Sequence, residues 1–403
     1  MKVENLKNFA ARLAAKIRSS IYVNNVVTTK QSLSDFSINS VAKSRLLHRT
    51  DSLSSATAAQ VPIETDHVAD AILVGRIIAF YQCATKADLG DSMWKVIFGL
   101  HHQEVHDALM EGDKKRIADI YRHPGNNELL FGFDFLRQTC QQEFERHTVR
   151  EVYAKLCLDG LVRFAESVGA IPLDNPETWA AGTGSLYDVE TTLAKLSQAC
   201  WPFSVPNPFP DEFGLSTSRG ILSYRVPQAL YQAWRIKQLV RGIENPRILE
   251  IGAGLGRTAY YVHELGIKDY TIVDIPLTAT AQAYFLGRAL GETQILLDGE
   301  PAAGSSQKIK ICTPQTFMDG NAKYDLIVNV DSLTEMDFST AKGYWQKIKA
   351  STNLFLSINH EANPFRVQDL MAEDSLDLDV SRGLYWMRRG YVEEVIQRHT
   401  DQP

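Results

Sequence analysis

The chain has 403 residues, of which 44% are hydrophobic and 22% are charged, an ordinary composition for a globular protein of about two domains. Its formal net charge of −6 argues against a nucleic-acid-binding surface. Five cysteines without a C-x-x-C pair exclude a disulfide framework and a zinc site, so we expect reduced thiols and a cytoplasmic protein. No apolar run approaches the ~18 residues of a membrane span.

The N-terminal half reads as helical. Residues 1–60 carry an amphipathic helix and then a serine-rich polar arm. Residues 61–210 are predicted to form a helical domain, because apolar side chains recur at helical spacing. Four prolines within residues 201–210 exclude a regular element there and mark the boundary of a third zone, residues 211–403.

Residues 211–403 alternate between short apolar strands and helices. This order predicts an α/β fold with a doubly wound, mostly parallel sheet. The predicted strands are residues 247–251, 270–274, 309–313, 324–330 and 353–359. The predicted helices are residues 221–242, 258–265, 278–290 and 340–349. A final hairpin is predicted from residues 383–387 and 391–396.

A glycine loop follows the first of these strands. Residues 247–261 read RILEIGAGLGRTAYY, so that Glu250 lies in the strand and Gly252, Gly254 and Gly256 follow at every second position. Glycines let a ligand approach the backbone closely, and a helix N-terminus offers free amide donors.

The spacing of the loop selects the ligand. A dinucleotide site requires the pattern G-x-G-x-x-G, and Arg257 stands where its third glycine belongs, which disfavours a nucleotide-dependent oxidoreductase. The next strand ends in Asp274, whose carboxylate can accept both hydroxyls of a ribose. The alternative is a glycine-rich turn in an ordinary α/β domain.

The pattern acid-x-G-x-G-x-G resembles motif I of the S-adenosylmethionine-dependent methyltransferases. Further segments, covering about residues 211–365, resemble the sugar O-methyltransferase family, bacterial enzymes associated with surface polysaccharides. The segments are GLSTSRGILSYRVPQALYQAW, RILEIGAGLGRTAYY, VDIP, YDLIVNVDSLTEM and SINHEANPF. The resemblance implies a Rossmann-like methyltransferase domain that uses S-adenosylmethionine to methylate a sugar hydroxyl, in polysaccharide or glycoconjugate biosynthesis. The alternatives are a methyltransferase for another small hydroxylated metabolite and a catalytically silent S-adenosylmethionine-binding module.

Ligands of doubly wound sheets bind beyond the carboxyl ends of the strands. This rule and the resemblance together select the residues expected at the cofactor. They are Arg219, Glu250, Gly252, Gly254, Gly256, Asp274, Ile275, Thr313, Gln315 and Asn329. Arg219 is expected to meet the methionine carboxylate, with an anionic sugar, a nucleotide-sugar phosphate or solvent as its alternatives.

Methyl transfer to a hydroxyl requires alignment of the two reacting atoms and removal of the hydroxyl proton. The candidate catalytic residues are His360 and Glu361, after the fifth strand, and Asp331, after the fourth. A histidine with an ordinary pKa near ~6.5 suits a base, although a surface histidine and a helix-capping acid are the plain alternatives. No metal is expected, and Mg²⁺ dependence would use Asp331, Glu335 and Glu361.

The expected partner is a small-molecule or glycan acceptor, with no nucleic acid and no membrane span. The helical N-terminal region is expected to build the acceptor pocket and to offer a homodimer interface. His101, His102 and His106 have metal-like spacing but no adjacent acid or cysteine, so no metal is expected there. Aromatic residues 201, 203 and 209 are expected to pack between domains rather than to hold a sugar.

Overall fold

The computed structural model describes residues 53, 56–61, 70–84, 93–134, 147–173, 187–210, 212–301, 304–372 and 378–398. The amphipathic helix and most of the polar arm expected at the N-terminus lie outside these residues. Within the described ranges, no helix has the length and apolar character needed to cross a bilayer.

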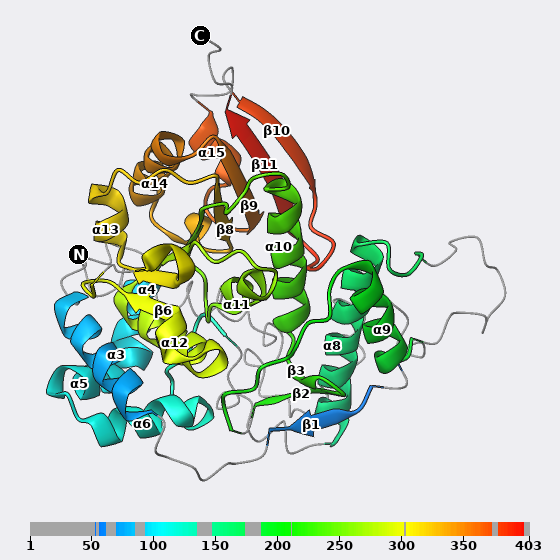
Figure 1. Ribbon diagram of the computed structural model, residues 1–403, viewed down its shortest axis with the longest axis horizontal. Helices are drawn as coiled ribbons and strands as arrows, with labels where there is room; N and C mark the ends of the chain where they lie inside the picture. The colour runs from blue at the N-terminus through cyan, green and yellow to red at the C-terminus, as the bar shows by residue number, and fades with distance from the viewer. Residues whose placement is uncertain are drawn as a thin grey trace, which may run out of the picture.

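A mostly parallel sheet of eight strands forms the centre of the C-terminal half (Figure 1). Its strands are β4 (Ile248–Ile251), β5 (Tyr270–Val273), β6 (Ile295–Leu297), β7 (Ile309–Cys312), β8 (Leu326–Val330), β9 (Leu354–His360), β10 (Leu378–Leu384) and β11 (Tyr391–Arg398). The order is β10-β11-β9-β8-β4-β5-β7-β6, parallel from β6 to β9 and antiparallel at β11 and β10. The chain changes direction across the sheet between β4 and β8, which places the switch point at the carboxyl ends of those strands. The predicted doubly wound sheet is therefore confirmed.

Helices cover both faces of this sheet. One face carries α10 (Val226–Leu239), α11 (Arg257–Glu264) and α12 (Pro276–Leu290), and the other carries α13 (Pro314–Asp319), α14 (Phe338–Ser351) and α15 (Val367–Met371). Successive strand residues point to opposite faces. Ile248 accordingly joins the core under the first set of helices, and Leu249 joins the core under the second.

The N-terminal half is helical, as predicted. It contains α3 (Ala71–Ala84), α4 (Met93–Ile97), a π-helical turn (Phe98–His102), α5 (Gln103–Glu111), α6 (Lys114–Arg122), α8 (His147–Ser167) and α9 (Val189–Ala199).

Short 3-10 turns occur at Pro124–Asn126, Glu292–Gln294, Ser305–Gln307 and Leu333–Glu335. A small antiparallel sheet joins β1 (Ala58–Gln60), β2 (Phe213–Thr217) and β3 (Gly220–Leu222).

Helix α3 packs directly on α12, as Figure 1 shows at the side where blue and yellow ribbons meet. A Cβ at Gly287 of α12 would lie 2.8 Å from the Leu73 side chain, so glycine permits this close approach. Buried Asp70 accepts hydrogen bonds from Arg122 of α6 and Arg288 of α12, at 2.6 and 2.8 Å. The helical region is thereby tied to the sheet domain.

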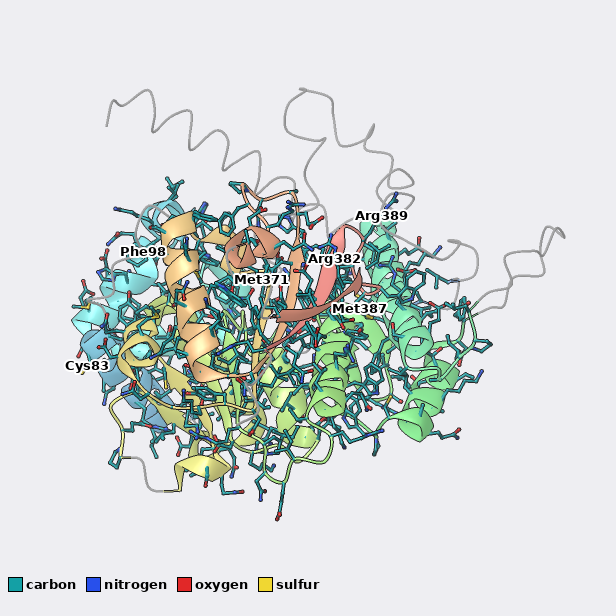
Figure 2. The ribbon with its side chains drawn as sticks, turned by 90° about the horizontal axis from the view of Figure 1, so that it is seen from above. Cys83, Phe98, Met371, Arg382, Met387 and Arg389 are labelled. Atoms are coloured by element: carbon teal, nitrogen blue, oxygen red, sulfur yellow. The ribbon has the colours of Figure 1, made fainter. Side chains whose placement is uncertain are left out.

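Helix α8 contacts the loop of the C-terminal hairpin. Arg163 donates to the backbone oxygen of Met387 at 3.3 Å, and Trp386 donates to Glu166 at 3.1 Å. Figure 2 shows Met387 at the end of the hairpin nearest the helices of this region. Helix α8 therefore holds the loop of the hairpin.

Several elements differ from the sequence prediction. The first hairpin strand is Leu378–Leu384 rather than 383–387, because Tyr385 and Met387 turn inward and are buried. The first helix begins at Val226 rather than at 221, because residues 220–222 pair with β2 and Pro227 favours the first helical turn. Strands β1, β2, β3 and β6 and helices α13 and α15 were not predicted. Residues 201, 203 and 209 are buried aromatics, as expected for packing.

Candidate active site

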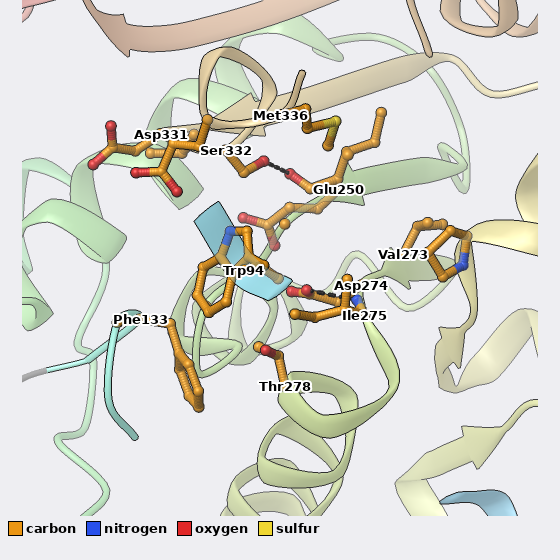
Figure 3. A pocket seen from close by; sticks show the side chains of 18 of the residues that line it. Trp94, Phe133, Glu250, Val273, Asp274, Ile275, Thr278, Asp331, Ser332 and Met336 are labelled. Atoms are coloured by element: carbon orange, nitrogen blue, oxygen red, sulfur yellow. Dashed lines mark hydrogen bonds between the residues drawn. The ribbon is translucent and has the colours of Figure 1, made fainter. Parts of the chain in front are cut away.

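A pocket of about 510 Å³ lies at the carboxyl ends of β4, β5 and β8. Its walls are the glycine loop, the residues that follow β5 and β8, the first turns of α10 and α14, and part of the helical region. Figure 3 shows its interior, with Asp274 and Asp331 on different strands facing the same space. This is where ligands of doubly wound sheets bind.

The three glycines of the loop have different roles. All three adopt positive φ, at 72° for Gly252, 57° for Gly254 and 88° for Gly256. A Cβ at Gly252 would collide with Ser332 after β8, and one at Gly256 would lie 3.2 Å from Leu286 of α12, so both positions also require glycine for packing. Gly252 and Gly254 line the pocket, whereas Gly256 does not.

Two acids lie beneath the pocket on neighbouring strands. Glu250 is 1% exposed and accepts one hydrogen bond, from the Tyr270 hydroxyl at 2.9 Å. Burial raises the pKa of Glu250 to about 7. Burial also raises the pKa of Asp274 to about 7, although its carboxylate accepts the backbone N–H of Ile275 at 2.8 Å.

Gln282 of α12 connects the second acid to the glycine loop. Its amide nitrogen donates to Asp274 at 2.6 Å and to the backbone oxygen of Gly254 at 2.9 Å. The sequence offered no sign of this role, because a glutamine in the second turn of an apolar helix carries no motif. Gln282 fixes the position of the acid relative to the loop.

Asp331 is the centre of a hydrogen-bond network at the other end of the pocket. Its Oδ2 accepts from the Tyr391 hydroxyl at 2.6 Å and from Arg388 Nη1 at 3.0 Å. Its Oδ1 is buried and accepts no hydrogen bond from the part of the chain that the structure describes, and His360 Nε2 lies 3.5 Å from it. Asp331 also has a left-handed φ of 56°, a conformation that non-glycine residues adopt rarely and often at functional sites.

His360 faces Asp331 rather than the pocket. Its Nδ1 accepts the backbone N–H of Ala362 at 3.3 Å, so in the neutral ring the proton lies on Nε2, on the side of Asp331. Glu361 points elsewhere and forms an ion pair with Arg382 at 2.9 Å. Of the three candidate catalytic residues, only Asp331 lines the pocket.

Arg219 lies away from the pocket. Its guanidinium binds the Ser197 hydroxyl and the backbone oxygens of Leu193 and Phe203, and it stacks 4.6 Å above the Phe203 ring. This arginine belongs to the turn between β2 and β3, which faces α9. The pocket is lined instead by Arg225, six residues later, at the N-cap of α10.

Of the other residues expected at the cofactor, two line the pocket and two lie outside its lining. Ile275 and Gln315 line the pocket. Thr313 caps α13 and contacts Asp298, and buried Asn329 donates to the backbone oxygen of Ile251 at 3.0 Å. These two brace the strand ends from outside the pocket lining.

One group of side chains has the spacing of a metal site. Asp331, Glu335 and His360 each offer an atom within 4.8 Å of the others. Glu361, expected in such a set, is engaged by Arg382 instead. Coordination by His360 Nε2 would require the other tautomer, whose Nδ1–H would face the N–H of Ala362.

The helical region supplies the remaining wall, which the sequence did not predict residue by residue. Trp94 and Phe133 line the pocket with ring centroids 6.4 Å apart (Figure 3). Arg257, at the start of α11, donates to Asp134 at 3.1 Å and to Glu212 at 3.0 Å. These ion pairs hold the segment that carries Phe133 against the glycine loop.

The histidines of the HHxxxH segment support this wall separately. His101 stacks on Phe131 with a centroid distance of 3.6 Å, and His106 Nδ1 lies 2.8 Å from the Tyr81 hydroxyl. His102 is buried, and burial lowers its pKa to about 4. Their rings have different partners and do not converge on one point.

No protein-family model matches this chain, and no curated protein matches it. Solved structures do match. One is the glycopeptide N-methyltransferase MtfA with S-adenosyl-L-homocysteine, at 13% identity and a TM-score of 0.31, covering 42% of this chain and 89% of that chain. Another is the mitomycin 7-O-methyltransferase MmcR, at 14% identity and a TM-score of 0.29, covering 44% and 56%.

The magnesium protoporphyrin IX methyltransferase ChlM from Synechocystis PCC 6803, with bound S-adenosylmethionine, also matches, at 13% identity and a TM-score of 0.29, covering 43% and 83%. These low identities and TM-scores assign no substrate or reaction to this chain.

Proposed function

We propose that this protein is an S-adenosylmethionine-dependent O-methyltransferase that methylates a hydroxyl of a sugar. The observation that carries the proposal is the pairing of two features across one pocket. A glycine loop with Asp274 lies on one side, and on the other lies a buried carboxylate oxygen of Asp331 that no described residue engages in a hydrogen bond.

The residues around the loop fit the nucleoside part of the methyl donor. Gly254 leaves its backbone open to the pocket, and Asp274, oriented by Gln282, accepts the ribose hydroxyls. Ile275 and Gln315 line the space beyond Asp274, where the adenine ring of the methyl donor would lie. Glu250 is close enough to Asp274 for their charges to interact, and it favours a cationic ligand above the loop.

S-Adenosylmethionine supplies a methyl group on a positively charged sulfur. The acceptor oxygen would displace that sulfur at the methyl carbon, and Asp331 Oδ1 would take the hydroxyl proton. Arg388 and Tyr391 occupy Oδ2, which leaves Oδ1 for the acceptor. A positioned base of this kind contributes about 10²–10⁴-fold to the rate.

The tautomer of His360 supports assigning the base to Asp331. A ring nitrogen that already carries a proton cannot accept the proton of the substrate, although it lies close to the carboxylate. His360 therefore acts as a positioning residue for Asp331. Glu335 and Asp337, which also line the pocket, offer further acceptors for the hydroxyls of a sugar.

Titration calorimetry with S-adenosylmethionine and S-adenosylhomocysteine tests this proposal. We expect micromolar binding to the wild type and none to Gly254→Val, whose side chain enters the pocket. Gly266→Val is the matched control. Gly266 also has a positive φ, of 87°, but a Cβ at this position would meet no atom within 4 Å, and the residue lies outside the pocket lining. Absence of binding to the wild type, or equal loss in both variants, contradicts the proposal.

A further inference from the structure

Charged side chains line the pocket unevenly. The acids are Asp134, Glu250, Asp274, Asp331, Glu335 and Asp337. The two cations in the described lining are Arg257 and Arg225. Arg257 is buried and is engaged by two carboxylates. The Arg225 guanidinium, in contrast, forms no hydrogen bond or ion pair with any residue that the structure describes.

Arg225 shares the lining of the pocket with Asp331, the proposed base. Burial raises the pKa of Tyr391, and the positive charges of Arg388 and Arg225 oppose that increase, which places Arg225 within electrostatic reach of the tyrosine. The hydroxyl of Tyr391 is 2.6 Å from Asp331 Oδ2. The positive charge of Arg225 therefore acts on the tyrosine that holds Asp331.

The backbone at Arg225 adds to the positive potential. Arg225 is the N-cap of α10, a helix of 14 residues, and Gln228 in its first turn also lines the pocket. The N-terminus of a helix favours a nearby negative charge. The guanidinium and the helix end therefore act on the same space.

An apolar surface lines the same pocket. The rings of Trp94 and Phe133, from the helical region, face its interior (Figure 3). Aromatic rings of this kind offer a flat surface for the apolar face of a cyclic ligand, and the indole N–H of tryptophan can donate to a polar substituent.

We propose that the acceptor is a sugar that carries an anionic group, either a carboxylate or a phosphate, and that Arg225 binds this group. The inference rests on the proposed function, because it concerns the second ligand of the same pocket. A guanidinium binds a carboxylate or a phosphate through two parallel hydrogen bonds, an arrangement that a neutral hydroxyl cannot provide. Arg225 is in this view the specificity-determining residue for the acceptor.

The test uses the full chain saturated with S-adenosylhomocysteine and three probes. Methyl glucoside is neutral, methyl glucuronide carries a carboxylate, and glucose 1-phosphate carries a phosphate. Titration followed by saturation-transfer NMR measures the affinity for each. We expect one anionic probe to bind about tenfold or more tightly than the neutral probe, and the identity of that probe distinguishes a carboxylate from a phosphate.

Arg225→Gln should remove that preference, while Arg241→Gln, at an exposed position beyond α10, should retain it. Equal affinity for all three probes, or binding of none, would overturn the inference. A third outcome would also overturn it: Arg225→Gln binds S-adenosylhomocysteine tenfold more weakly but binds 5′-methylthioadenosine as tightly as the wild type does. The second compound lacks the amino-acid carboxylate, so this result would mean that Arg225 binds the methyl donor. Failure of S-adenosylhomocysteine to bind the wild type would instead contradict the proposed function.

Discussion

The backbone of Asp331 lies in the left-handed region, where aspartate and asparagine are better tolerated than other side chains. Asp331→Asn therefore preserves the local conformation and an oxygen for Tyr391 and Arg388, but it removes the proposed base. We expect kcat to fall by about 10²–10⁴-fold while the affinity for S-adenosylhomocysteine stays within twofold. Single-turnover methyl transfer and calorimetry measure the two quantities.

Glu361→Gln is the matched control for this substitution. Glu361 comes from a neighbouring strand end but is paired with Arg382 outside the pocket. Its substitution should change kcat by less than about twofold, since exposed ion pairs contribute little. An Asp331→Asn variant that is as active as Glu361→Gln would leave the protein without the proposed base.

Glu250 makes the stability of the ligand-free protein depend on pH. Its pKa is about 7 in the folded state, whereas an unfolded glutamate titrates near ~4.3. Between these values the folded state keeps a proton that the unfolded state has released, so the free energy of unfolding decreases as the pH rises toward 7. Glu250→Gln remains neutral and keeps an acceptor for Tyr270.

We therefore expect Glu250→Gln to be more stable than the wild type at pH 8, by on the order of 1–3 kcal/mol. The difference should shrink toward zero at pH 4.5. Urea unfolding at the two pH values measures it. A difference that does not change with pH would mean that Glu250 is already ionised at low pH in the folded protein.

At the scale of elements, the docking of α3 and α6 on α12 depends on Asp70. Its carboxylate is buried and binds Arg122, Arg288 and the Tyr284 hydroxyl. Asp70→Asn leaves two arginines without their counter-charge, and we expect the free energy of unfolding to fall by about 3 kcal/mol. Chemical denaturation measures the loss.

Asp107→Asn is the control, because Asp107 is an exposed acid on α5 of the same region. Its effect should stay within about 0.5 kcal/mol. If the two substitutions were equal in effect, the Asp70 cluster would not be what attaches the helical region.

The sequence predicted elements well where one physical rule decides the outcome. Alternating strands and helices dictate the doubly wound sheet, and the carboxyl-end rule brings Gly252, Asp274 and Asp331 to one pocket. The choice between Arg219 and Arg225 was beyond that rule. It depends on where β3 ends and α10 begins, and a short hairpin turns the first arginine toward α9.

The aromatic wall of the pocket could not be predicted from the sequence, because it depends on tertiary packing. Trp94 reaches the pocket of Asp274, far away in sequence, only because α3 docks on α12, and Gly132, with a φ of 95°, lets the indole ring pack against its backbone. No local pattern contains that contact. For the same reason, the hydrogen bond that fixes the tautomer of His360 follows from the turn after β9 and not from the residue type.

At the scale of the whole molecule, the pocket connects the two halves of the chain. The backbone oxygen of Phe133 would lie 3.5 Å from a Cβ at Gly254, and Arg257 joins the segment of Asp134 to α11. A ligand in this pocket contacts both halves, so its binding energy should stabilise both together.

Hydrogen exchange followed by mass spectrometry tests this coupling. With S-adenosylhomocysteine at a hundredfold excess over its Kd, the gain in stability is about 2.7 kcal/mol. We expect slower exchange both in α11 and in residues 129–134, with no change in α9, which lies outside the pocket. Protection confined to the sheet and α11 would mean that the helical region does not close the cofactor side of the pocket, and the acceptor would then be the ligand that meets Trp94 and Phe133.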